Sequence, residues 1–330
     1  MEVWGTLDDG RDVHRITLQQ GEFKAHVLTL GAIVQDLRWS PHPFPLVLGS
    51  EQLSDYLGPM RYFGAIVGRF ANRLGNGQFK LNGQQYQVSQ NEKHRHCLHG
   101  GMQGSGTRLW TVGELWPNKV ALVLTQDDGD MGFPGTLNTR VCISLEDQAL
   151  RFEISATSDQ DTLCNFTHHG FFCLDDTNTI AQHELQLLAA RVLDIDNDLI
   201  PTGLLNAVAG TAFDFTVPRT LGGQAIDHHF CLAQSRQPMR PVAWLRSRVS
   251  NIELQVETTE TGIQVYTADH IAESGWLGLD GRHYRPQSGL ALETQAWPDA
   301  PNHAHFSSAV LRAGDTYHAQ ACYRFSQLEP

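Results

Sequence analysis

The feature that most constrains this fold is an alternation of apolar and polar residues with a period of two. From Leu150 to Thr157, apolar side chains alternate with charged or hydroxyl side chains. The same alternation runs through residues 141–145, and three polar residues, 146–148, separate the two runs. Such alternation is typical of strands with one buried face, and two runs joined by a short polar segment indicate a β-hairpin. The pattern therefore favours antiparallel β structure.

Further β-rich runs extend this pattern along the chain. They cover residues 25–39, 119–125, 252–258, 263–267 and 319–325. Because only Thr259-Glu260-Thr261-Gly262 separates 252–258 from 263–267, we expect a second hairpin there. Helical candidates are few: residues 50–57 suit a short capped turn of helix, whereas residues 183–192 suit either period and are predicted as a strand.

Glycine and proline are spread as turn residues and are not concentrated in a linker. The 330 residues include 30 glycines and 14 prolines, with no low-complexity tract or fixed-period repeat. Length alone suggests about two domains, but a β-sandwich can exceed ~200 residues as one domain. Many strands without a βαβ rhythm favour an antiparallel sandwich or barrel. We therefore predict an all-β chain with very few short helices, folded as a single domain over residues 1–330.

Charge and cysteine spacing argue against several classes of function. Acidic residues number 36 and basic residues 24, for a formal net charge of −12, and no basic patch is evident. We therefore expect no nucleic-acid binding and no membrane association. No apolar run approaches the roughly 18–20 residues that span a bilayer, and the acidic start is unlike a signal peptide. The six cysteines are scattered without a CxxC pair, which favours reduced thiols and a cytoplasmic location.

Histidine is unusually frequent, with 16 copies, many of them beside Asp, Glu, Asn or another His. The run His-Arg-His-Cys-Leu-His-Gly-Gly at 94–101 contains good zinc ligands, but its spacing matches no strong zinc pattern. We predict no metal site and expect a polar loop with one or two histidines facing a polar ligand. The doublets 168–169 and 228–229 are further candidates, since histidine exchanges protons near physiological pH when a partner of opposite function faces it.

Two other segments supply polar groups of the right kind. Glu293 follows the strand-like run 289–292 and precedes a Trp-Pro turn, where desolvation raises the pKa of a carboxyl group. Residues 68–73 carry Arg69, Asn72 and Arg73, which suit multidentate hydrogen bonding to hydroxyls or carboxylates. No dinucleotide fingerprint, Walker loop or GxSxG elbow is present, which argues against nucleotide and serine-hydrolase chemistry.

Seven motifs run in order along the chain: GRFANRL at 68–74, CLHGG at 97–101, DGDMGFPG at 128–135, NFTHH at 165–169, LIPTG at 199–203, DHHF at 227–230 and LETQ at 292–295. Each motif is moderately specific. The ordered set, from about residue 20 to the final Tyr-Arg-Phe-Ser at 323–326, resembles the aldose 1-epimerase (galactose mutarotase) family. The resemblance covers nearly the whole chain, and it implies a large antiparallel β-supersandwich with an open polar cleft on one face.

The resemblance also implies an activity, the interconversion of the α and β anomers of a free hexose such as galactose or glucose. Removing a proton from the anomeric hydroxyl while delivering one to the ring oxygen opens the ring, and closure on the other face reverses both transfers. No metal or organic cofactor is implied. On this resemblance Glu293 matches the general base and His169 the general acid.

Five further residues match the sugar-binding positions of the family. His99 matches the histidine near the ring oxygen, and Arg73 with Asn72 matches the polar group at the cleft floor. Asp227 resembles the carboxylate that fixes sugar hydroxyls, and Gln264 the amide that supports it. The implied partner is a small sugar, and we expect a monomer or a homodimer.

Several positions depart from the family pattern without removing a proton-transfer residue. They are His168, Phe171, Cys173, His229, Ala268 and Ala296, and they leave the preferred sugar open. Three alternatives also remain: a sugar-binding protein without catalysis, a glycoside hydrolase with Asp227 as its second carboxylate, and a mutarotase for another sugar or a hexose phosphate. The last predicts clustered basic residues at the cleft, which the acidic composition does not indicate.

Overall fold

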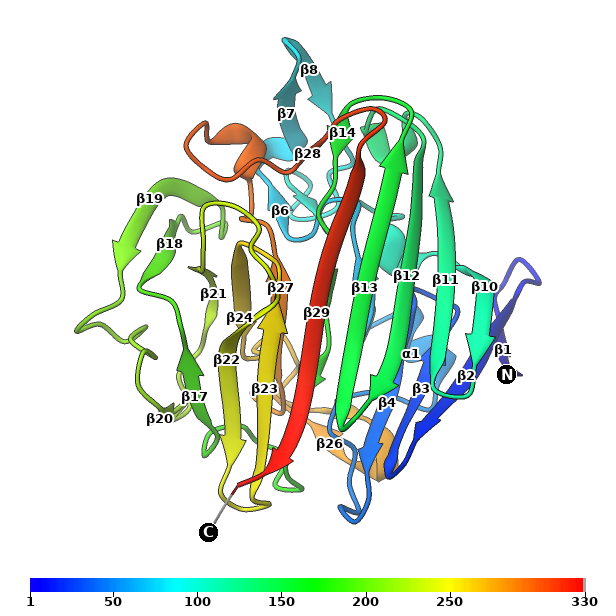
Figure 1. Ribbon diagram of the computed structural model, residues 1–330, viewed down its shortest axis with the longest axis vertical. Coiled ribbons are helices and arrows are strands. Elements are labelled where there is room, and N and C mark those ends of the chain that lie inside the picture. Colours follow the sequence, from blue (N-terminus) through cyan, green and yellow to red (C-terminus); the bar gives the residue numbers. More distant parts are fainter. Residues whose placement is uncertain (329–330) are drawn as a thin grey trace.

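Antiparallel sheets dominate the computed structural model, which describes residues 1–328 (Figure 1). The prediction of an all-β chain with very few short helices is confirmed. The last two residues of the predicted domain 1–330 lie outside the described part, and the prediction of a single domain stays a prediction. Three large sheets and five small two-stranded sheets account for the strands of the described residues.

The three large sheets contain most of the extended chain. The four-stranded sheet has the order β1 (Glu2–Thr6), β2 (Asp12–Gln20), β3 (Phe23–Leu28), β4 (Ile33–Trp39). The nine-stranded sheet has the order β10 (Thr111–Trp116), β11 (Lys119–Gln126), β12 (Leu137–Glu146), β13 (Ala149–Ser158), β29 (Thr316–Gln327), β23 (Ile252–Thr258), β22 (Arg240–Ser247), β17 (Glu184–Leu187), β20 (Arg219–Thr220). The six-stranded sheet has the order β16 (Phe171–Phe172), β27 (Leu290–Gln295), β24 (Gly262–Tyr266), β21 (Asp227–Cys231), β18 (Arg191–Ile195), β19 (Pro201–Ala207).

Small pairs and turns complete the described chain. The pairs are β14 (Thr162–Leu163) with β28 (Val310–Leu311), β15 (Thr167–His168) with β5 (Ile66–Val67), β6 (Arg73–Leu74) with β9 (Cys97–Leu98), β7 (Gln78–Leu81) with β8 (Gln84–Gln87), and β25 (Trp276–Leu277) with β26 (His283–Tyr284). The α-helix is α1 (Leu53–Leu57), and short 3₁₀ turns lie at Gly75–Gly77, Ser105–Thr107, Asp130–Gly132, Leu279–Gly281 and Ala300–Asn302. Helix α1 falls within the predicted segment 50–57, but its N-cap residue Gln52 makes no side-chain capping bond.

The first hairpin prediction is confirmed and the second is wrong. Strands β12 and β13 pair in antiparallel register around residues 146–149. Strands β23 and β24, by contrast, belong to different sheets. The segment between them is buried and crosses the interior, because the carbonyl of Thr261 accepts bonds from Leu232, Ala233 and Trp297 while the carboxylate of Glu260 binds Arg236. A surface turn and a crossing between two sheets can therefore have the same polar sequence pattern.

The other predicted strands are present with two adjustments. Residues 25–39 form two strands, β3 and β4, which pair with each other. Residues 183–192 contain all of β17 and the first two residues of β18, which lie in different sheets, so the predicted single strand is two strands. The runs at 119–125 and 319–325 fall within β11 and β29.

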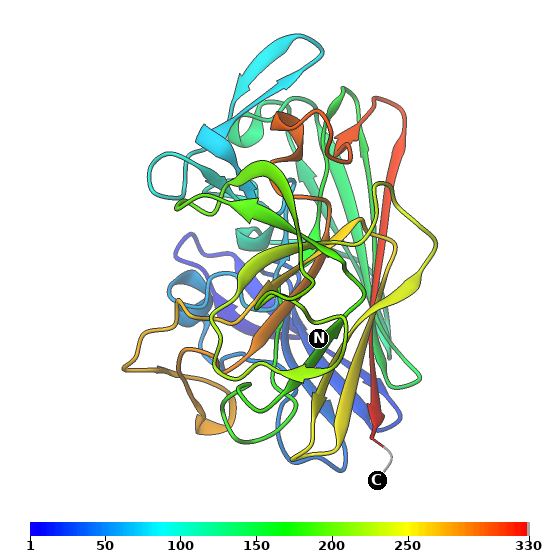
Figure 2. The same cartoon turned by 90° about the vertical axis from the view of Figure 1, so that its left-hand side faces the viewer.

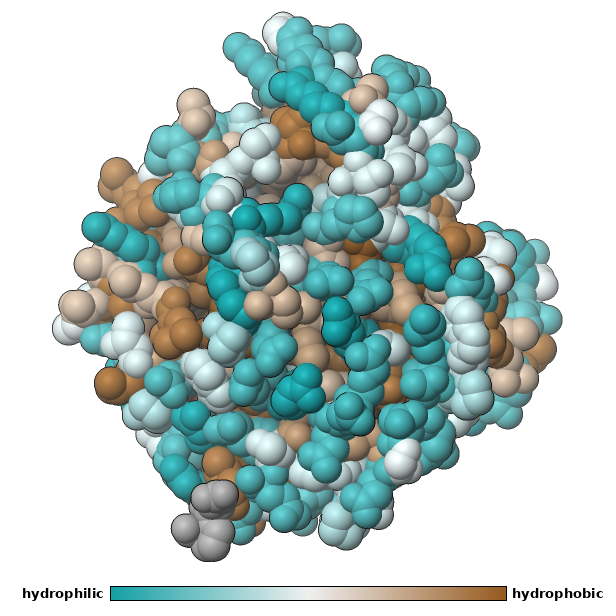
Figure 3. All heavy atoms as spheres, viewed as in Figure 1, coloured by the Kyte–Doolittle hydropathy of each residue, from teal (hydrophilic) through white to brown (hydrophobic). Residues whose placement is uncertain are grey.

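The nine-stranded sheet packs against the four- and six-stranded sheets through one large hydrophobic core (Figure 2). Phe172 stacks on Tyr323 with ring centroids 4.9 Å apart, and the Tyr323 hydroxyl donates to the carbonyl of Leu292, which ties β29 to β27. The opposite face of β13 carries the polar half of the alternation, and hydrophilic side chains cover much of this side (Figure 3). No helix within residues 1–328 combines the length and the apolar character needed to cross a membrane.

Candidate active site

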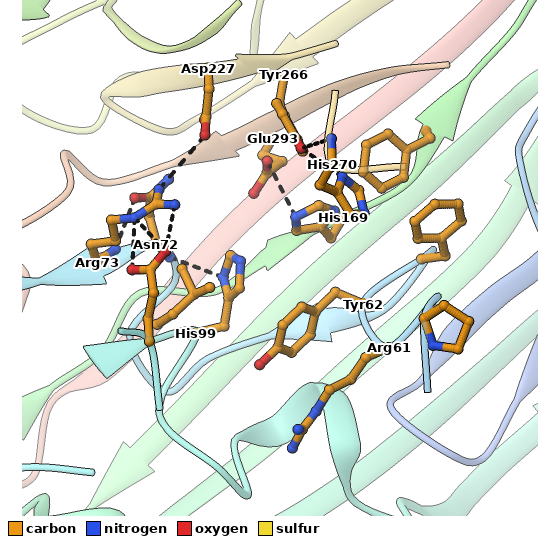
Figure 4. Close-up of a pocket in the computed structure, with 15 residues that line it drawn as sticks. Arg61, Tyr62, Asn72, Arg73, His99, His169, Asp227, Tyr266, His270 and Glu293 are labelled. Atoms are coloured by element: carbon orange, nitrogen blue, oxygen red, sulfur yellow. Dashed lines mark hydrogen bonds and ion pairs between the residues drawn. The ribbon is translucent and has the colours of Figure 1, made fainter. Parts of the chain in front are cut away.

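A pocket of about 350 Å³ is lined by side chains of the six-stranded sheet and of segments outside that sheet. Its volume falls within the range of pockets for small ligands, ~300–1,000 Å³. Figure 4 shows Arg73 and Asn72 on one side of it and Tyr62 and His270 on the other, with Glu293 and His169 between them. The guanidinium and amide groups of Arg73 and Asn72 thus lie across the pocket from the aromatic rings of Tyr62 and His270.

Three adjacent strands bring the first group of side chains together. Glu293 on β27 lies directly opposite Gln264 on β24, and Asp227 on β21 lies opposite Tyr266 of β24. Because alternate residues of a strand and their cross-strand partners share one face, these side chains project to the same side of the sheet. The Gln264 amide donates to Asp227 at 2.5 Å, so Gln264 holds Asp227 from behind and does not itself line the pocket.

A second group comes from the segments that pack over that sheet. His169 follows β15, while Asn72 precedes β6 and His99 follows β9, two strands that pair with each other. The Asn165 side chain accepts a bond from the Ala296 amide at 2.9 Å and donates to the Ala71 carbonyl, which fixes the arginine-bearing segment beside β27. Residues remote in sequence therefore share one pocket.

Glu293 and His169 face each other at the centre of the pocket. The Nε2 atom of His169 lies 3.6 Å from Oε1 of Glu293, and the two residues are only 7% and 2% exposed. No hydrogen bond from residues 1–328 reaches the Glu293 carboxylate or the Nδ1 atom of His169. Burial raises the pKa of Glu293 well above its usual value, with the Asp227 charge adding to the effect and Arg73 opposing it. Burial also lowers the pKa of His169 to about 4.

Because the two pKa values shift in opposite directions, the two groups form a pair that can share one proton. Desolvation disfavours both charges, so it favours the form with the proton on Glu293 and a neutral His169. Moving that proton to His169 produces a carboxylate and an imidazolium with the same total number of protons. Such coupled groups titrate as a unit. The pair can therefore act as acid and base in either direction.

His99 presents a defined hydrogen-bonding edge. Its Nδ1 atom accepts the backbone N–H of Asn72 at 3.2 Å, and burial lowers the pKa of its imidazole well below the usual value. A neutral ring that accepts through Nδ1 carries its proton on Nε2. The ring of Tyr62 packs edge-on against His99 with centroids 4.8 Å apart, which restricts its rotation. His99 is thus a fixed N–H donor.

Arg73 is held by two acidic residues. Glu92 binds the Nε and Nη2 atoms of Arg73 at 2.9 and 2.8 Å, while Nη1 lies 3.9 Å from Asp227. Arg69, the other arginine of the same motif, is fully buried outside the pocket and donates to the carbonyls of Pro134, Gly135 and Gln126. Of the two arginines, Arg73 lines the pocket and Arg69 does not.

The structure brings all seven sequence-predicted site residues together. Glu293, His169, His99, Asn72, Arg73 and Asp227 line the pocket, and Gln264 contacts Asp227. His168 points the other way, into the core, where it stacks on Phe152 with centroids 4.3 Å apart.

Sequence reasoning missed Glu92, Tyr62, Tyr266 and His270, which also line the pocket. The Tyr266 hydroxyl lies 2.6 Å from Nδ1 of His270 and accepts the His270 backbone N–H at 3.0 Å. For two of these residues the sequence offers proximity to a predicted feature: Tyr266 lies two residues after Gln264, and Glu92 lies two residues before the histidine-rich run. Neither position has a pattern that separates it from an ordinary polar surface.

One group among residues 1–328 has metal-ligand spacing, and it lies outside the pocket. Its three members, Cys173, Asp175 and His183, are buried with ligand atoms within 4.8 Å of one another. Nε2 of His183 already accepts the Leu174 amide, and Asp175 accepts a bond from Ser247. The donor atoms are thus engaged in protein hydrogen bonds.

The histidine-rich run 94–99 does not converge on a common point. His94 is exposed, and the two ring nitrogens of His96 face the Asn76 amide and Asp198. His99 faces the pocket instead. The run therefore serves as a polar loop beside the pocket.

Comparison with known proteins gives consistent results. A family model described as Aldose 1-epimerase matches residues 14–324. Galactose mutarotase from Mus musculus is 34% identical over 337 residues, with 98% of this chain and 97% of that protein covered. Aldose 1-epimerase from Haemophilus influenzae is 35% identical, with coverage of 84% and 85%. The solved structure of an aldose epimerase homologue from C. elegans superposes with a TM-score of 0.89 at 29% identity, covering 96% of this chain and 100% of the other.

Proposed function

Because this chain belongs to the aldose 1-epimerase family, we propose that it is a mutarotase that interconverts the α and β anomers of a free aldose, with Glu293 and His169 exchanging the protons. The observation that carries the proposal is the buried pair itself. The two side chains face each other at 3.6 Å inside a pocket, and no hydrogen bond from residues 1–328 reaches Oε2 of Glu293 or Nδ1 of His169. A sugar bound against the two side chains would supply hydrogen-bonding partners to both of them.

The chemistry balances with these two groups alone. The Glu293 carboxylate takes the proton of the anomeric hydroxyl, whose electrons form the C1 carbonyl. The bond from C1 to the ring oxygen breaks, and the ring oxygen takes a proton from the His169 imidazolium. Glu293 is then protonated and His169 neutral, which is the state that burial favours. Rotation about C1–C2 and closure on the other face return both protons.

The remaining polar groups are suited to holding the sugar. His99 offers its Nε2–H near His169, where the ring oxygen must lie, with the two rings 5.1 Å apart. Asp227 and Arg73 offer a carboxylate and a guanidinium for hydroxyls, and Gln264 orients Asp227. These fixed groups can hold part of the ring while C1 turns.

A neutral hexose fits the charges of the pocket better than a hexose phosphate. The cations that line the pocket are Arg61 and Arg73. Glu92 engages Arg73 through two nitrogens, and the Met102 carbonyl accepts a bond from Arg61. Galactose and glucose are therefore the substrates we propose. The glycosidase alternative is less suitable because Asp227 is occupied by Gln264 and faces Arg73.

We also propose a cytoplasmic location, no nucleic-acid or membrane partner, a single domain over 1–330, and a monomeric or homodimeric state. Support for the location comes from the cysteines, because all six are free. Support for one domain comes from the nine-stranded sheet, which combines strands from Thr111 to Gln327. The net charge of −12 supports the absence of polyanionic partners.

Polarimetry of freshly dissolved α-anomers tests the proposed function. We expect the purified protein to accelerate the approach to anomeric equilibrium of α-D-galactose, α-D-glucose or both, in proportion to its concentration. NMR exchange between the two anomeric signals provides the same rate at equilibrium. Sugar binding measured by calorimetry without any acceleration across a panel of aldoses would instead favour the non-catalytic binding protein.

A further inference from the structure

The loop over residues 91–96 lies beside the pocket and carries Glu92 to Arg73. We propose that Glu92 is a positioning residue, which aligns the Arg73 guanidinium for the sugar, and that the tight turn behind it exists to place Glu92. The inference rests on the proposed function, because it concerns how the same pocket binds its sugar. The proposal also gives a structural role to the histidine-rich run, which metal binding does not explain.

The contact between Glu92 and Arg73 fixes the orientation of the guanidinium. Oε2 of Glu92 accepts from Nε at 2.9 Å, and Oε1 accepts from Nη2 at 2.8 Å. Two parallel bonds of this kind hold the guanidinium plane as well as its position. The Nη1 atom is left on the far side, 3.9 Å from Asp227, where a sugar hydroxyl can bridge the two groups.

Burial makes this orientation matter. The side chains of Arg73 and Glu92 are 10% and 17% exposed, so solvent weakens their interaction less than it would on an open surface. An arginine side chain has many rotamers, and ordering it during sugar binding would cost conformational entropy. Glu92 imposes that order before the sugar arrives, which favours sugar binding through preorganisation.

A tight turn delivers Glu92 to this position. The amide of Arg95 donates to the Glu92 carbonyl at 3.0 Å, and the Glu92 amide donates to the His96 carbonyl at 3.1 Å. The two central residues, Lys93 and His94, have φ of 49° and 51°. Positive φ at both central positions is the pattern of a type I′ turn, which normally contains Asn and Gly. The chain thus keeps an unfavourable backbone at two ordinary residues.

The back of the turn is pinned to one carboxylate. Asp198 accepts bonds from Lys93 at 2.8 Å and Arg95 at 3.2 Å, and it lies 3.3 Å from Nε2 of His96. Nδ1 of His96 accepts the Asn76 amide at 3.1 Å, so the neutral ring donates to Asp198 through Nε2. Three residues of the loop 91–96 therefore converge on Asp198, while Glu92 of the same loop binds Arg73.

The main test is the variant Glu92→Gln, assayed by polarimetry with D-galactose and D-glucose. We expect KM to rise about tenfold with kcat within threefold of wild type, because Arg73 contacts the sugar in both the ground state and the transition state. The same exchange in an Arg73→Met background is expected to leave KM unchanged. An equal rise in both backgrounds would overturn the proposal, as would an unchanged KM in Glu92→Gln alone.

Two variants in the same turn serve as matched comparisons. His94→Gly removes an exposed side chain and relaxes its positive φ, so KM and kcat should stay as in wild type. Asp198→Asn loosens the back of the turn, and KM should rise about threefold with kcat retained. A purely structural loop would instead lower the melting temperature of the variants and leave KM alone.

Affinity for 1,5-anhydro-D-galactitol separates failure of this inference from failure of the proposed function. The compound lacks an anomeric hydroxyl, so it can bind but cannot undergo mutarotation. A wild-type protein without catalysis that binds this probe tenfold more tightly than Glu92→Gln overturns the proposed reaction and supports the role of Glu92. A catalytically active wild type that binds it no better than Glu92→Gln overturns the role of Glu92 alone.

Discussion

Two glutamates in this protein are almost equally buried, and their surroundings are opposite. Glu260 lies where the chain crosses between sheets and is 1% exposed, while Glu293 lies in the pocket and is 2% exposed. Oε1 of Glu260 accepts bonds from Arg236 at 2.9 Å and from the Tyr317 hydroxyl at 3.2 Å, whereas Oε2 has no hydrogen-bond partner within residues 1–328. Glu293 faces His169 at 3.6 Å, and no hydrogen bond from residues 1–328 reaches its carboxylate.

The difference teaches how to distinguish a structural from a reactive buried charge. At the crossing, the protein supplies a counter-ion and a hydroxyl donor, as stability requires of a buried carboxylate. In the pocket no hydrogen bond from residues 1–328 reaches the Glu293 carboxylate, and burial raises its pKa, with Asp227 adding to the effect and Arg73 only partly opposing it. An unsatisfied buried acid is unfavourable for folding but ready to exchange a proton. Burial alone would not separate the two residues; their partners do.

The variant Glu293→Gln gives the largest expected effect on this comparison. It removes the proposed base, so kcat should fall by roughly two to four orders of magnitude. The melting temperature should stay the same or rise, because no hydrogen bond to the carboxylate is lost. Polarimetry and thermal melting measure the two quantities on the same preparation. Near wild-type rates in this variant would sink the assignment.

The pH dependence of wild-type kcat/KM is the second expected effect. The pair is active with one proton, so activity falls as pH drops through about 4, where His169 gains a second proton for the pair. It also falls as pH rises through the elevated pKa of Glu293, where the pair loses its proton. Each limb should approach tenfold per pH unit after subtraction of the spontaneous rate. Circular dichroism checks folding at each pH, and a single monotonic limb would contradict the shared proton.

The matched variant Glu260→Gln should reverse the pattern of Glu293→Gln. It weakens a buried ion pair, so the free energy of unfolding should fall by about 2–3 kcal/mol, allowing for the partial exposure of Arg236. The value of kcat should remain within twofold of wild type. Chemical denaturation and polarimetry provide the two measurements. Loss of catalysis without loss of stability would remove the distinction between the two glutamates.

The smallest expected effect concerns His168, the core neighbour of His169. Burial lowers the pKa of His168 to about 3, so below the unfolded value of ~6.5 the unfolded chain binds a proton that the folded chain excludes. Stability is therefore full above pH ~6.5 and is lost as pH falls. His168→Phe should make the protein about 2 kcal/mol less sensitive to a change from pH 8 to pH 5. Equal losses of stability in both proteins over that range would contradict it.

Sequence patterns predicted local strands and polar motifs better than the relation between layers. The alternation at 150–157 depends only on which face of one strand is buried, so it reproduced β13. The polar segment 259–262 resembles a surface turn but is an interior crossing. Glu260 can be buried there because Arg236 forms an ion pair with it and the Tyr317 hydroxyl donates a hydrogen bond to it, and both residues are distant in sequence. The partners that decide such a case come from elsewhere in the chain.

The same reason explains what was found and missed at the pocket. Arg69 and Arg73 lie in one motif, and only the fold shows that Arg69 binds carbonyls while Arg73 faces Asp227. Glu92 carries no motif and was missed, although it touches Arg73. The seven residues identified through the family resemblance lie together in the structure, and their roles stay a prediction. An ordered set of motifs carries information on three-dimensional neighbours that spacing alone does not.

The position of β29 has a consequence for how this protein is made. The last strand of the chain lies in the middle of the nine-stranded sheet, between β13 and β23. Strands β10–β13 and strands β17, β20, β22 and β23 are synthesised first, yet they have no shared border until residues 316–327 are added. Closing such distant contacts is slow. The two halves therefore keep open edges until residues 316–327 leave the ribosome and pair with both, and during this interval the nascent chain most needs protection from aggregation.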